Sequence, residues 1–484
     1  MLIAIKFGGT SVGSADRIRS AAGLIARIQA EGHRVVAVTS AMSGVTNRLV
    51  TLAEGVSSSA ADESTRIAEY FRFTRDLEQS HLKVAQQAIG DAQLVEHVAE
   101  SLYAERHGLE RVLLGSNLLG ELSPIGYDYV VSAGERLALA ILANCLRDTG
   151  VDAVPLGGGE SGIVTDNNYG CAAPDLEQTR QKVRQTLLPL LDNGKLPVVA
   201  GFYGHSTEGR VAILGRGGSD FSATLIGCSL DADEIWIMTD VDGIKTSDPR
   251  IVPAARTMSE MSYLMAAEMA YLGAKVLHPR SVLPAARQRI PLRIASSFEP
   301  DKPGTRLITE VPCAEPTVRA LTLVRGGGLI RAASTGIDPE RMTFNSVIDD
   351  IRRHNIDILA SATGFNGGNL LWLVGNLDLE RFLQVLRGHQ NGQFRIDVQR
   401  SVAMVGVVGE RVATAAGILA RVARCLEDAS AAPFAVLQGA TPNSIVVALP
   451  DEEQKLGATL TRLHTELGLD AQSRNRPFTV GGMA

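Results

Sequence analysis

The sequence has few cysteines, and they form no pattern that would bind a metal. The five are scattered singly, at Cys145, Cys171, Cys228, Cys313 and Cys425. No CxxC pair or Cys/His cluster is present, so we expect neither a zinc site nor a disulfide scaffold, and we assign no residue as a dedicated metal ligand. Scattered single thiols are typical of a reducing compartment.

Long apolar runs are also missing. No stretch approaches the ~20 uninterrupted apolar residues that a membrane-spanning helix needs. The N-terminal MLIAIKFGGTS has no basic segment followed by a long apolar one, so it is typical of a first strand and not of a signal peptide. The net charge of −6 provides no basic field for nucleic acid or an acidic membrane surface. We therefore expect a cytoplasmic protein with no nucleic-acid or membrane partner.

The chain does have enough apolar material for several cores. It has 484 residues, 45% of them hydrophobic, which predicts two to four domains at ~100–200 residues each. A buried strand at 2–7 precedes a helical pattern at 15–30 and a second buried strand at 34–40. This order predicts an α/β domain with a doubly wound, mainly parallel sheet. Further strands of the same scheme are predicted at 151–156, 196–202, 210–215, 234–241 and 291–295.

Two stretches interrupt this alternation. Residues 60–120 are rich in Ala, Glu, Gln, Leu and Arg, and predict a helical insertion packed on the core, or alternatively a loosely packed surface arm. A proline-rich zone near residue 310 predicts a domain boundary. We expect a large α/β domain at 1–300, a linker at 301–316, and two tandem α+β modules of βαββαβ order at 317–395 and 396–484.

The first glycine-rich loop, KFGGTS (6–11), lies where the first predicted strand ends. Gly8 and Gly9 let backbone N–H groups approach an anion without obstruction by a Cβ atom. Lys6 adds a positive charge, so the loop predicts a site that holds phosphates and neutralises charge on a transferring phosphoryl group. The alternative is a plain tight turn.

The second glycine-rich loop, LGRGGSD (214–220), follows a predicted strand and opens a helical pattern. Ser219 or Asp220 would cap that helix, whose N-terminus is itself an anion site. Arg216 offers a planar fork that suits a carboxylate or a phosphate. The spacing matches neither the GxGxxG dinucleotide fingerprint nor a Walker A loop. The alternative is a capped helix start with a solvent-exposed arginine.

A third motif, TDVDG (239–243), continues another predicted strand into a turn and is followed by KTSDPR (245–250). Open α/β sheets bind ligands at the carboxyl ends of their strands, where this motif lies. Aspartates also form turns without any function, and the motif alone favours that simpler interpretation.

Taken together, these motifs resemble those of the aspartokinases. KFGGTSV, SAMSGVTN (40–47), SAGE (132–135), LGRGGSD, TDVDGIKTSDPR and LGAKVLHPRS (272–281) occur in the order seen in that family, across residues 1–300. The two terminal modules look like its tandem ACT domains. The resemblance implies an amino-acid-kinase fold and an enzyme that uses ATP to phosphorylate the side-chain carboxylate of L-aspartate. Its product would be 4-phospho-L-aspartate, on the way to lysine, threonine and methionine.

The resemblance also implies a role for each residue of the aspartate site. Ser40 and Thr46 match positions that line it. Glu135 matches the acid that pairs with the substrate ammonium group, although an acid in the first turn of a helix is the alternative. Arg216 matches the arginine that clamps the α-carboxylate, and Ser219 lies beside the phosphate.

The implied catalytic residues are Lys6, which stabilises the transferred phosphoryl group, and Asp220, which orients Lys6 beside Mg²⁺. ATP and Mg²⁺ are the implied cofactors. A general base is not needed, because a carboxylate with a pKa of ~3.9 is already ionised at neutral pH. A structural role is accordingly favoured for His278. The nucleotide-binding residues implied are Lys6, Gly8, Gly9, Thr10, Thr239, Asp240, Asp248, Arg250 and Lys275.

Some positions depart from the family. Lys245 stands where relatives carry a tyrosine, which leaves the packing on the adenine side open. The first module differs at VRGGGLIRAASTGIDPERM (324–342) and ATGFNGGNLLWL (362–373). Its three glycines, 326–328, would form either a backbone nest or a flexible turn.

ACT modules imply feedback control and self-association. We expect lysine or threonine as an effector at the modules, and a homodimer or higher homo-oligomer formed through them. Two other functions stay open. One is a kinase of the same family that acts on glutamate or a nucleotide; the other is a non-catalytic amino-acid sensor, against which intact Lys6, Arg216, Asp220 and Asp240 argue.

Overall fold

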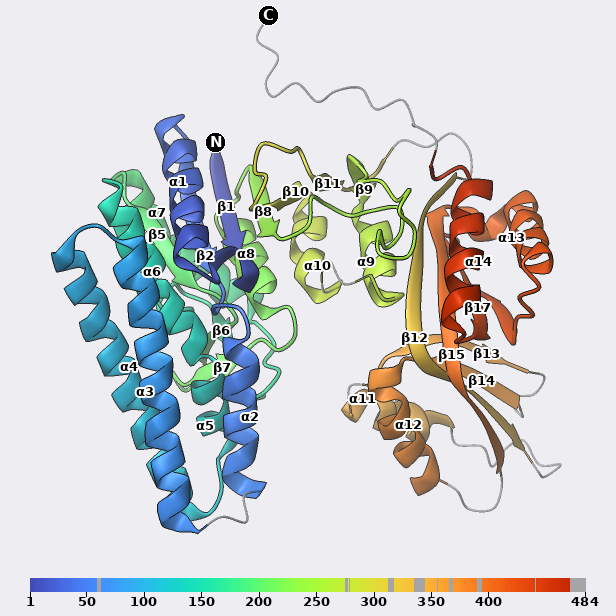
Figure 1. The fold of residues 1–484 in the computed structure, drawn as a ribbon, viewed down its shortest axis with the longest axis horizontal. Coiled ribbons are helices and arrows are strands. Elements are labelled where there is room, and N and C mark those ends of the chain that lie inside the picture. The colour runs from blue at the N-terminus through green and yellow to red at the C-terminus, as the bar shows by residue number, and fades with distance from the viewer. Residues whose placement is uncertain are drawn as a thin grey trace, which may run out of the picture. The chain divides into compact units, whose positions relative to one another are not determined.

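The computed structural model describes residues 1–58, 62–274, 277, 279–311, 317–334, 344–354, 356–364, 369–389, 394–439 and 441–470 (Figure 1). The chain forms two compact units. Unit 1 consists of Met1–Ile244 and Arg280–Thr309, and unit 2 of Lys245–Pro279 and Glu310–Ala484. Residues 245–279, which we expected in the first domain, therefore cluster with the C-terminal modules.

Unit 1 is built on a mainly parallel sheet, as predicted. Its strand order is β3-β5-β2-β1-β8-β10-β11, and β11 alone of these runs antiparallel to its neighbour. The strands are β1 (Leu2–Phe7), β2 (Arg34–Thr39), β3 (Ala153–Leu156), β5 (Leu196–Ala200), β8 (Glu234–Thr239), β10 (Leu292–Ser296) and β11 (Thr305–Ile308).

Helices cover both faces of this sheet. α1 and α6 pack on one face, whereas α8 lies on the other and packs against α7. The helices of unit 1 are α1 (Ala15–Ala30), α2 (Val45–Ser58), α3 (Glu63–Ala88), α4 (Ala92–Leu119), α5 (Pro124–Val131), α6 (Ala133–Asp148), α7 (Leu176–Asp192), α8 (Gly218–Ser229) and α10 (Pro279–Gln288).

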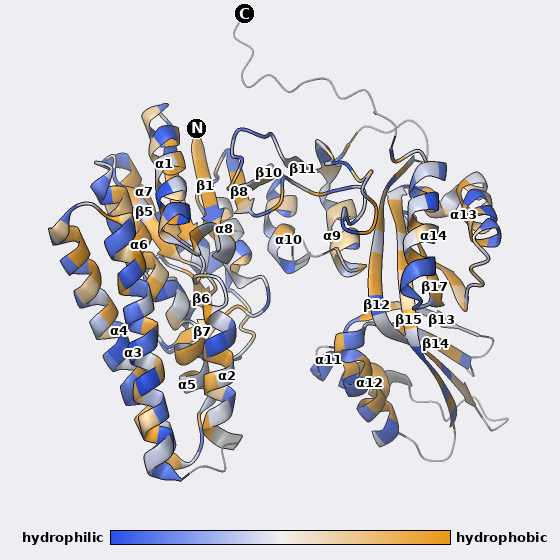
Figure 2. Cartoon of the chain, in the orientation of Figure 1, coloured by the Kyte–Doolittle hydropathy of each residue, from blue (hydrophilic) through white to orange (hydrophobic). Residues whose placement is uncertain are grey.

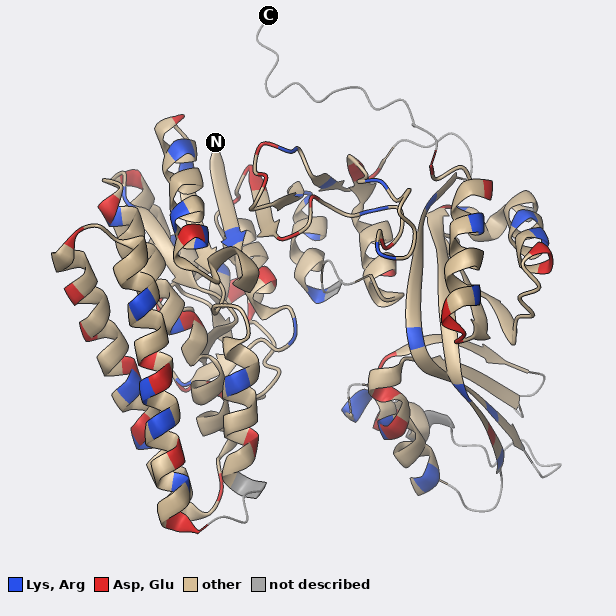
Figure 3. Ribbon diagram, viewed as in Figure 1, with Lys and Arg blue, Asp and Glu red and all other residues tan. Residues whose placement is uncertain are grey.

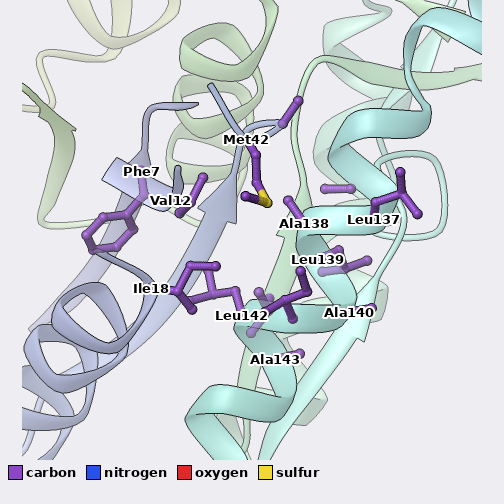
Figure 4. Packing of buried hydrophobic residues seen from close by; sticks show 14 of the residues in the cluster. Phe7, Val12, Ile18, Met42, Leu137, Ala138, Leu139, Ala140, Leu142 and Ala143 are labelled. Atoms are coloured by element: carbon purple, nitrogen blue, oxygen red, sulfur yellow. The ribbon is translucent and has the colours of Figure 1, made fainter. Parts of the chain in front are cut away.

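The alternation of side chains along β1 determines what each face of the sheet receives. Ile3, Ile5 and Phe7 belong to the hydrophobic core shared with α1 and α6. Figure 4 shows Phe7 among the side chains of this core. Ala4 points the other way, since a Cβ atom on Gly227 of α8 would lie 3.2 Å from its Cβ. Lys6 shares the face of Ala4 and therefore points towards α8. Figure 2 shows β1 as an almost uniformly hydrophobic strand.

The predicted helical insertion consists of α3 and α4, and it is packed, not a loose arm. Leu77 and Leu102 are buried in the main core of unit 1. Both signs of charge lie along these helices (Figure 3), and Arg106 of α4 pairs with Glu78 of α3 and with Glu110, at 2.8 Å each. The helices are thus joined by apolar contacts and by an ion-pair network.

The strand predicted at 210–215 does not join the main sheet. It forms β7 (Val211–Ile213) in a small sheet with β6 (Tyr203–Ser206) and β4 (Val164–Thr165). β6 and β7 pair antiparallel through a tight turn, in which Gly209 has a φ of +74° and donates its N–H to the carbonyl of Ser206. The prediction of a parallel strand here was wrong, because apolar periodicity does not identify the partner of a strand.

One stretch, Pro124–Asp148, is long and apolar enough to cross a membrane by length and composition. It comprises α5 and α6. In the structure 83% of its most apolar window is buried, as in the core helix of a folded domain.

The modules of unit 2 share an antiparallel sheet with the order β13-β14-β12-β15-β17-β16. The elements of unit 2 are β9 (Glu260–Ser262), α9 (Tyr263–Tyr271), β12 (Thr317–Ser334), α11 (Phe344–Arg353), β13 (Ile358–Thr363), β14 (Asn369–Val374), α12 (Asn376–Gly388), β15 (Phe394–Glu410), α13 (Ala416–Asp428), β16 (Ala435–Gln438), β17 (Ser444–Pro450) and α14 (Glu453–Glu466).

The two modules are nested and not strictly tandem. Residues 317–324 of β12 pair with the second half of β15, which in turn pairs with β17. Residues 328–333 of β12 instead pair with β14 and the first half of β15. The segment VRALTLV (318–324) therefore belongs to the second module, although we predicted it in the first. One long apolar strand supplies both modules, which the sequence pattern does not reveal.

Gly326, Gly327 and Gly328 lie where β12 passes from one module to the other. The pairing of β12 with β15 shifts register here, and Gly326 donates its N–H to the carboxylate of Asp451 at 2.7 Å. A Cβ atom on Gly327 would lie 2.2 Å from the Cε of Met404. The glycines are therefore part of a closely packed strand and not a flexible turn.

Residues 245–274 pack onto the second module. Val252 belongs to its hydrophobic core, and Thr441 donates a hydrogen bond to Glu268 of α9. Nε2 of His464 in α14 lies 2.9 Å from Oγ1 of Thr246. This segment is thus an integral part of unit 2.

Candidate active site

The candidate site lies at the edge of unit 1 where the parallel strands end. Gly8, after β1, donates its N–H to the carbonyl of Met238 in β8 at 3.0 Å. Ser40, after β2, donates its backbone N–H to the carbonyl of Phe7 at 3.2 Å. Gly201, after β5, donates to Thr39 at 2.9 Å. The strand order reverses between β1 and β8, and such switch points are where open α/β sheets bind ligands.

Lys6 and Asp220 meet at this edge. The Nζ atom of Lys6 lies 2.5 Å from Oδ1 of Asp220, and the two side chains are 10% and 15% exposed. Lys6 comes from the C-terminal end of β1 and Asp220 from the first turn of α8. The carboxylate fixes the ammonium group next to Gly8, where a Cβ atom would lie 3.5 Å from Nζ.

The second glycine-rich loop leads into α8, but not through the cap that we predicted. Gly217 is the N-cap residue, with a φ of +70°, and no side chain caps the helix. Ser219 and Asp220 lie inside the first turn, so the prediction that either caps α8 was wrong: Asp220 pairs with Lys6 instead. Arg216 is exposed, and none of the described carboxylates pairs with it.

Glu135 lies in the first turn of α6 and is 3% exposed. Burial raises the pKa of Glu135 to about 8, opposed by a hydrogen bond from the backbone of Ala41 and by the charges of Arg136 and Lys6. Within the part of the chain that the structure describes, its Oε2 atom has no hydrogen-bond partner. A buried carboxylate oxygen without a partner, within electrostatic range of Lys6, is suited to receive a cationic group of a ligand.

Two glycines allow the close packing that surrounds Glu135. A Cβ atom on Gly134 would lie 2.6 Å from the Cβ of Ala41, and one on Gly9 would lie 2.8 Å from the carbonyl oxygen of Ala41. The loop after β2 is therefore held between the first glycine-rich loop and α6. This loop contains Ser40, which is half-buried. Thr46, also half-buried, follows in the first turn of α2.

Thr239 and Asp240 lie at the end of β8. The hydroxyl of Thr239 donates to Oδ1 of Asp240 at 3.1 Å, and Asp240 is exposed. Ser297, after β10, lies 2.7 Å from the hydroxyl of Ser11 and 3.1 Å from the carbonyl oxygen of Thr239. The strand ends of β1, β8 and β10 are therefore connected through hydroxyl groups. Thr10 is exposed in the turn between them.

The other predicted nucleotide-binding residues belong to unit 2. The side chains of Asp248 and Arg250 pair with each other at 2.6 Å, and Arg250 is 83% exposed. The side chain of Lys245 donates to Thr257 at 3.2 Å. Lys275 and His278 lie outside the described residues.

Sequence reasoning missed two residues that support this edge. Ser297 follows a predicted strand, and a hydroxyl residue at such a strand end was the available signal. Asp128 gave no signal, because an aspartate in YDYVVSAGE resembles any polar residue on a helix. It is nevertheless completely buried.

Chemically, the edge combines groups of opposite preference. Lys6, the amides of the first glycine-rich loop and the N-terminus of α8 favour phosphate. Glu135 favours an ammonium group. The arrangement can hold a phosphate chain and a cationic small molecule side by side, which phosphoryl transfer to an amino acid requires.

Comparison with known proteins identifies the family of the chain. Residues 1–296 match the model of the amino acid kinase family. The lysine-sensitive aspartokinase 3 of Escherichia coli is 31% identical over 479 residues, covering 96% of this chain and 99% of the relative. An aspartate kinase of Pseudomonas putida is 30% identical over 481 residues, with 98% and 99% covered. The crystal structure of E. coli aspartokinase III with aspartate and ADP (R-state) matches with a TM-score of 0.81 at 29% identity, covering 96% of this chain and 99% of that one.

Proposed function

The chain belongs to the amino acid kinase family, and we propose that it is an aspartate kinase, which transfers the γ-phosphoryl group of ATP to the side-chain carboxylate of L-aspartate. The observation that carries this proposal is the buried, unpartnered carboxylate oxygen of Glu135 close to Lys6. A nucleoside monophosphate acceptor has no cationic group to pair with it, whereas the ammonium group of an amino acid would satisfy it. Relatives named for this activity, similar over nearly their full length, support the proposal.

The reaction needs charge control more than proton transfer. The acceptor carboxylate is ionised at neutral pH, so an oxygen of aspartate attacks the γ-phosphorus, the bond to ADP breaks, and no proton is exchanged. The difficulty is the approach of two anions. Lys6, held by Asp220, and the backbone amides of Gly8 and Gly9 would neutralise the charge that develops on the transferred group.

The amino acid substrate would be held at both ends. We assign its ammonium group to Glu135 and its α-carboxylate to Arg216, whose fork suits bidentate contact and pairs with none of the described carboxylates. Ser40 and Thr46, from the loop after β2 and the start of α2, and Ser219, from α8, would line the remaining surface. The acceptor carboxylate would then face Lys6.

The nucleotide would occupy the ends of β1 and β8. We assign its phosphates to Lys6 and to the loop Gly8, Gly9 and Thr10, and its other contacts in unit 1 to Thr239 and Asp240. Asp248, Arg250 and Lys275 stay predictions from the resemblance to the family. Mg²⁺ would enter with ATP and supply further charge neutralisation. The carboxylate of Asp220 and the hydroxyl of Ser219, both in the first turn of α8, provide the oxygen ligands that this ion prefers.

We further propose that unit 2 senses an end product of the pathway. The E. coli relative is named lysine-sensitive, and its structure with lysine and aspartate (T-state) matches this chain with a TM-score of 0.78. Lysine is our first candidate effector and threonine the second, bound at the modules of a homodimer or higher homo-oligomer. We place the enzyme in the cytoplasm, in keeping with the free thiols of Cys145, Cys171, Cys228 and Cys425. Titration of activity with lysine, threonine and methionine tests the regulation, and no response to any of them would refute it.

The decisive experiment for catalysis measures ADP release with aspartate, glutamate, UMP or no acceptor. Hydroxylamine in a parallel reaction traps an acyl phosphate as the hydroxamate. We expect ADP and hydroxamate in equal amounts with aspartate alone. Equal or faster turnover with glutamate or UMP would assign another kinase of the family, and no ADP with any acceptor would indicate a non-catalytic sensor.

A further inference from the structure

Asp128, in α5, is a completely buried carboxylate that binds backbone instead of a cation. Its side chain has no exposed surface. Oδ1 accepts the N–H of Gly170 at 2.9 Å, and Oδ2 accepts the N–H of Gly170 at 3.0 Å and of Ile213 at 2.9 Å. These donors lie 42 and 85 residues away in the chain. The carboxylate therefore joins α5 to two loops that are distant in sequence.

The side chain of Asp128 fixes the base of the loop that carries Arg216. Ile213 is the last residue of β7, three positions before Arg216. Its carbonyl accepts the N–H of Ala172 at 2.8 Å, so the Gly170 loop and the end of β7 form one layer beneath the second glycine-rich loop. A Cβ atom on Gly215 would lie 3.0 Å from the sulfur of Cys171, which shows how closely this layer supports the loop.

The backbone of Asp128 fixes the other half of the substrate site. Its carbonyl accepts the N–H of Ser132 at 3.1 Å and the hydroxyl of Ser132 at 2.6 Å. The hydroxyl oxygen of Ser132 in turn accepts a hydrogen bond from Nη1 of Arg136 at 2.8 Å. Ser132 is the residue from which α6 starts, and Glu135 lies in its first turn. One residue thus holds the start of the helix that bears Glu135 and the base of the loop that bears Arg216.

This arrangement is costly for the folded protein. Burial raises the pKa of Asp128 to about 6, and only the two backbone N–H groups oppose the shift. A neutral side chain would avoid the cost of burying a charge. An apolar side chain could not replace the carboxylate, because only its oxygens can accept the N–H groups of Gly170 and Ile213 and so hold these two backbone segments at a defined separation.

We propose that Asp128 is a positioning residue that sets the separation between Glu135 and Arg216 and thereby the affinity for the amino acid substrate. The inference rests on the proposed function, which assigns those two residues to the ends of aspartate. Among the described hydrogen bonds, none joins Asp128 to the nucleotide loop after β1. Loss of Asp128 should therefore affect the use of aspartate selectively, because misplacing a group that positions the substrate by about 1 Å can reduce activity ~10²-fold.

The test compares Asp128→Ala and Asp128→Asn with a matched control. Oδ2 of Asp128 accepts the N–H groups of both Gly170 and Ile213. An asparagine whose oxygen takes the place of Oδ2 therefore keeps both hydrogen bonds. Its NH₂ group, in the place of Oδ1, faces the N–H of Gly170, which is unfavourable because both groups are donors. Asparagine should therefore rescue in part. Asp148→Ala is the control, because Asp148 also accepts two backbone N–H groups, from Gly90 and Asp91 at 2.9 and 3.0 Å, but joins α6 to the turn between α3 and α4.

We expect Asp128→Ala to raise the KM for aspartate at least ~10-fold, with the KM for ATP changed less than twofold, and Asp128→Asn to fall between it and the wild type. Asp148→Ala should lower the melting temperature and leave both KM values unchanged. An unchanged KM for aspartate in a folded Asp128→Ala, or equal rises for aspartate and ATP, would refute the positioning role. If Asp128→Ala does not fold, Asp128→Asn alone decides by the same criterion. Wild-type protein without aspartate-dependent turnover would refute the proposed function instead.

Discussion

The ammonium group of Lys6 lies 2.5 Å from the carboxylate of Asp220, although the two residues are 214 positions apart. The alternation of β1 directs Lys6 to the face covered by α8, and Gly217 starts α8 so that Asp220 falls in its first turn. The pair is thus a consequence of the fold. It keeps a flexible cation in one place at the edge where the phosphate is expected.

Replacing Lys6 with methionine should reduce kcat at least ~10²-fold while leaving the protein folded, since one preorganised group that stabilises transition-state charge contributes about that much. The KM for aspartate should change little. Steady-state kinetics measures the first effect, and circular dichroism confirms the fold. Near-normal turnover in Lys6→Met would overturn the catalytic assignment.

Stability provides an independent check of the same pair. Lys6→Met leaves the carboxylate of Asp220 buried without a cation, which should cost about 3 kcal/mol of unfolding free energy. The double variant Lys6→Met/Asp220→Asn should recover most of this cost without recovering activity. If the double variant is as unstable as the single one, the pair is not the source of the loss.

Glu135 should make aspartate binding depend on pH. Its pKa of about 8 in the ligand-free protein means that the carboxyl is largely protonated at pH 7, whereas an ammonium ligand requires the ionised form. Affinity should therefore rise about tenfold per pH unit as pH increases towards 8, then level off, and binding near pH 7 should release a proton. Calorimetry in two buffers of different ionisation enthalpy measures the release.

The variant Glu135→Gln separates this effect from other titrations. It should bind aspartate weakly and with a flat pH profile between 6 and 8. Because the pKa of Glu135 is raised in the folded state, its ionisation destabilises the protein as pH rises from about 4.5 to 8. Glu135→Gln should accordingly melt higher than the wild type at pH 8 but not at pH 4.5. A wild type whose affinity does not vary with pH contradicts the assignment.

Gly134 should tolerate no side chain, because a Cβ atom there would lie 2.6 Å from the Cβ of Ala41 and 3.0 Å from Cγ1 of Val45. Gly134→Ala should displace the loop of Ser40 from α6, cost about 1–3 kcal/mol and raise the KM for aspartate. The control is Gly227→Ala in α8, whose Cβ would lie 2.6 Å from Ile235 in the core. It should lose similar stability without the change in KM, measured by thermal denaturation and kinetics.

Local patterns predicted the parts of the structure that local interactions determine. The helix expected at 15–30 is α1 at the same residues, because Ser14 caps it and its apolar positions recur at helical spacing. The strands that end in glycine-rich loops were also predicted from local pattern, because each is a short apolar run followed by glycines. The position of Lys6 at this edge then follows from the parallel strands, whose carboxyl ends meet on the same side of a sheet. Glu135 lies in the first turn of a helix, and its place in the site was predicted from the resemblance alone.

Contacts between residues that are distant in the chain could not be predicted from local sequence patterns. The choice of Gly217 over Ser219 as the N-cap depends on a positive φ, which the composition GRGGS permits at several positions. The nesting of the modules depends on which strands pair with β12. Asp128 owes its burial to donors that are 42 and 85 residues away, and no periodicity reports such contacts.

The contact between His464 and Thr246 should make unit 2 sensitive to acid. Burial lowers the pKa of His464 below its ordinary value, and Asp470 and Arg256 act on it in opposite directions. The hydroxyl of Thr246 accepts the N–H of Arg256 at 3.0 Å, so its own proton is available to Nε2 of a neutral His464. Because the folded pKa is depressed, this stabilisation is complete above about pH 6.5 and is lost as pH falls below it.

The variant His464→Gln tests this sign. A glutamine amide can keep a hydrogen bond to Thr246 but does not titrate. The melting temperature of the wild type should fall between pH 7 and pH 5.5. The melting temperature of His464→Gln should fall clearly less over the same range. Glu268 also titrates in this range, because burial raises its pKa to about 7. Its ionisation destabilises unit 2 as pH rises, which is the opposite pH dependence to that of His464. Introducing Glu268→Gln into both the wild type and His464→Gln removes this contribution. If the two pH profiles remain parallel once Glu268 is neutralised, His464 does not determine the acid sensitivity of unit 2.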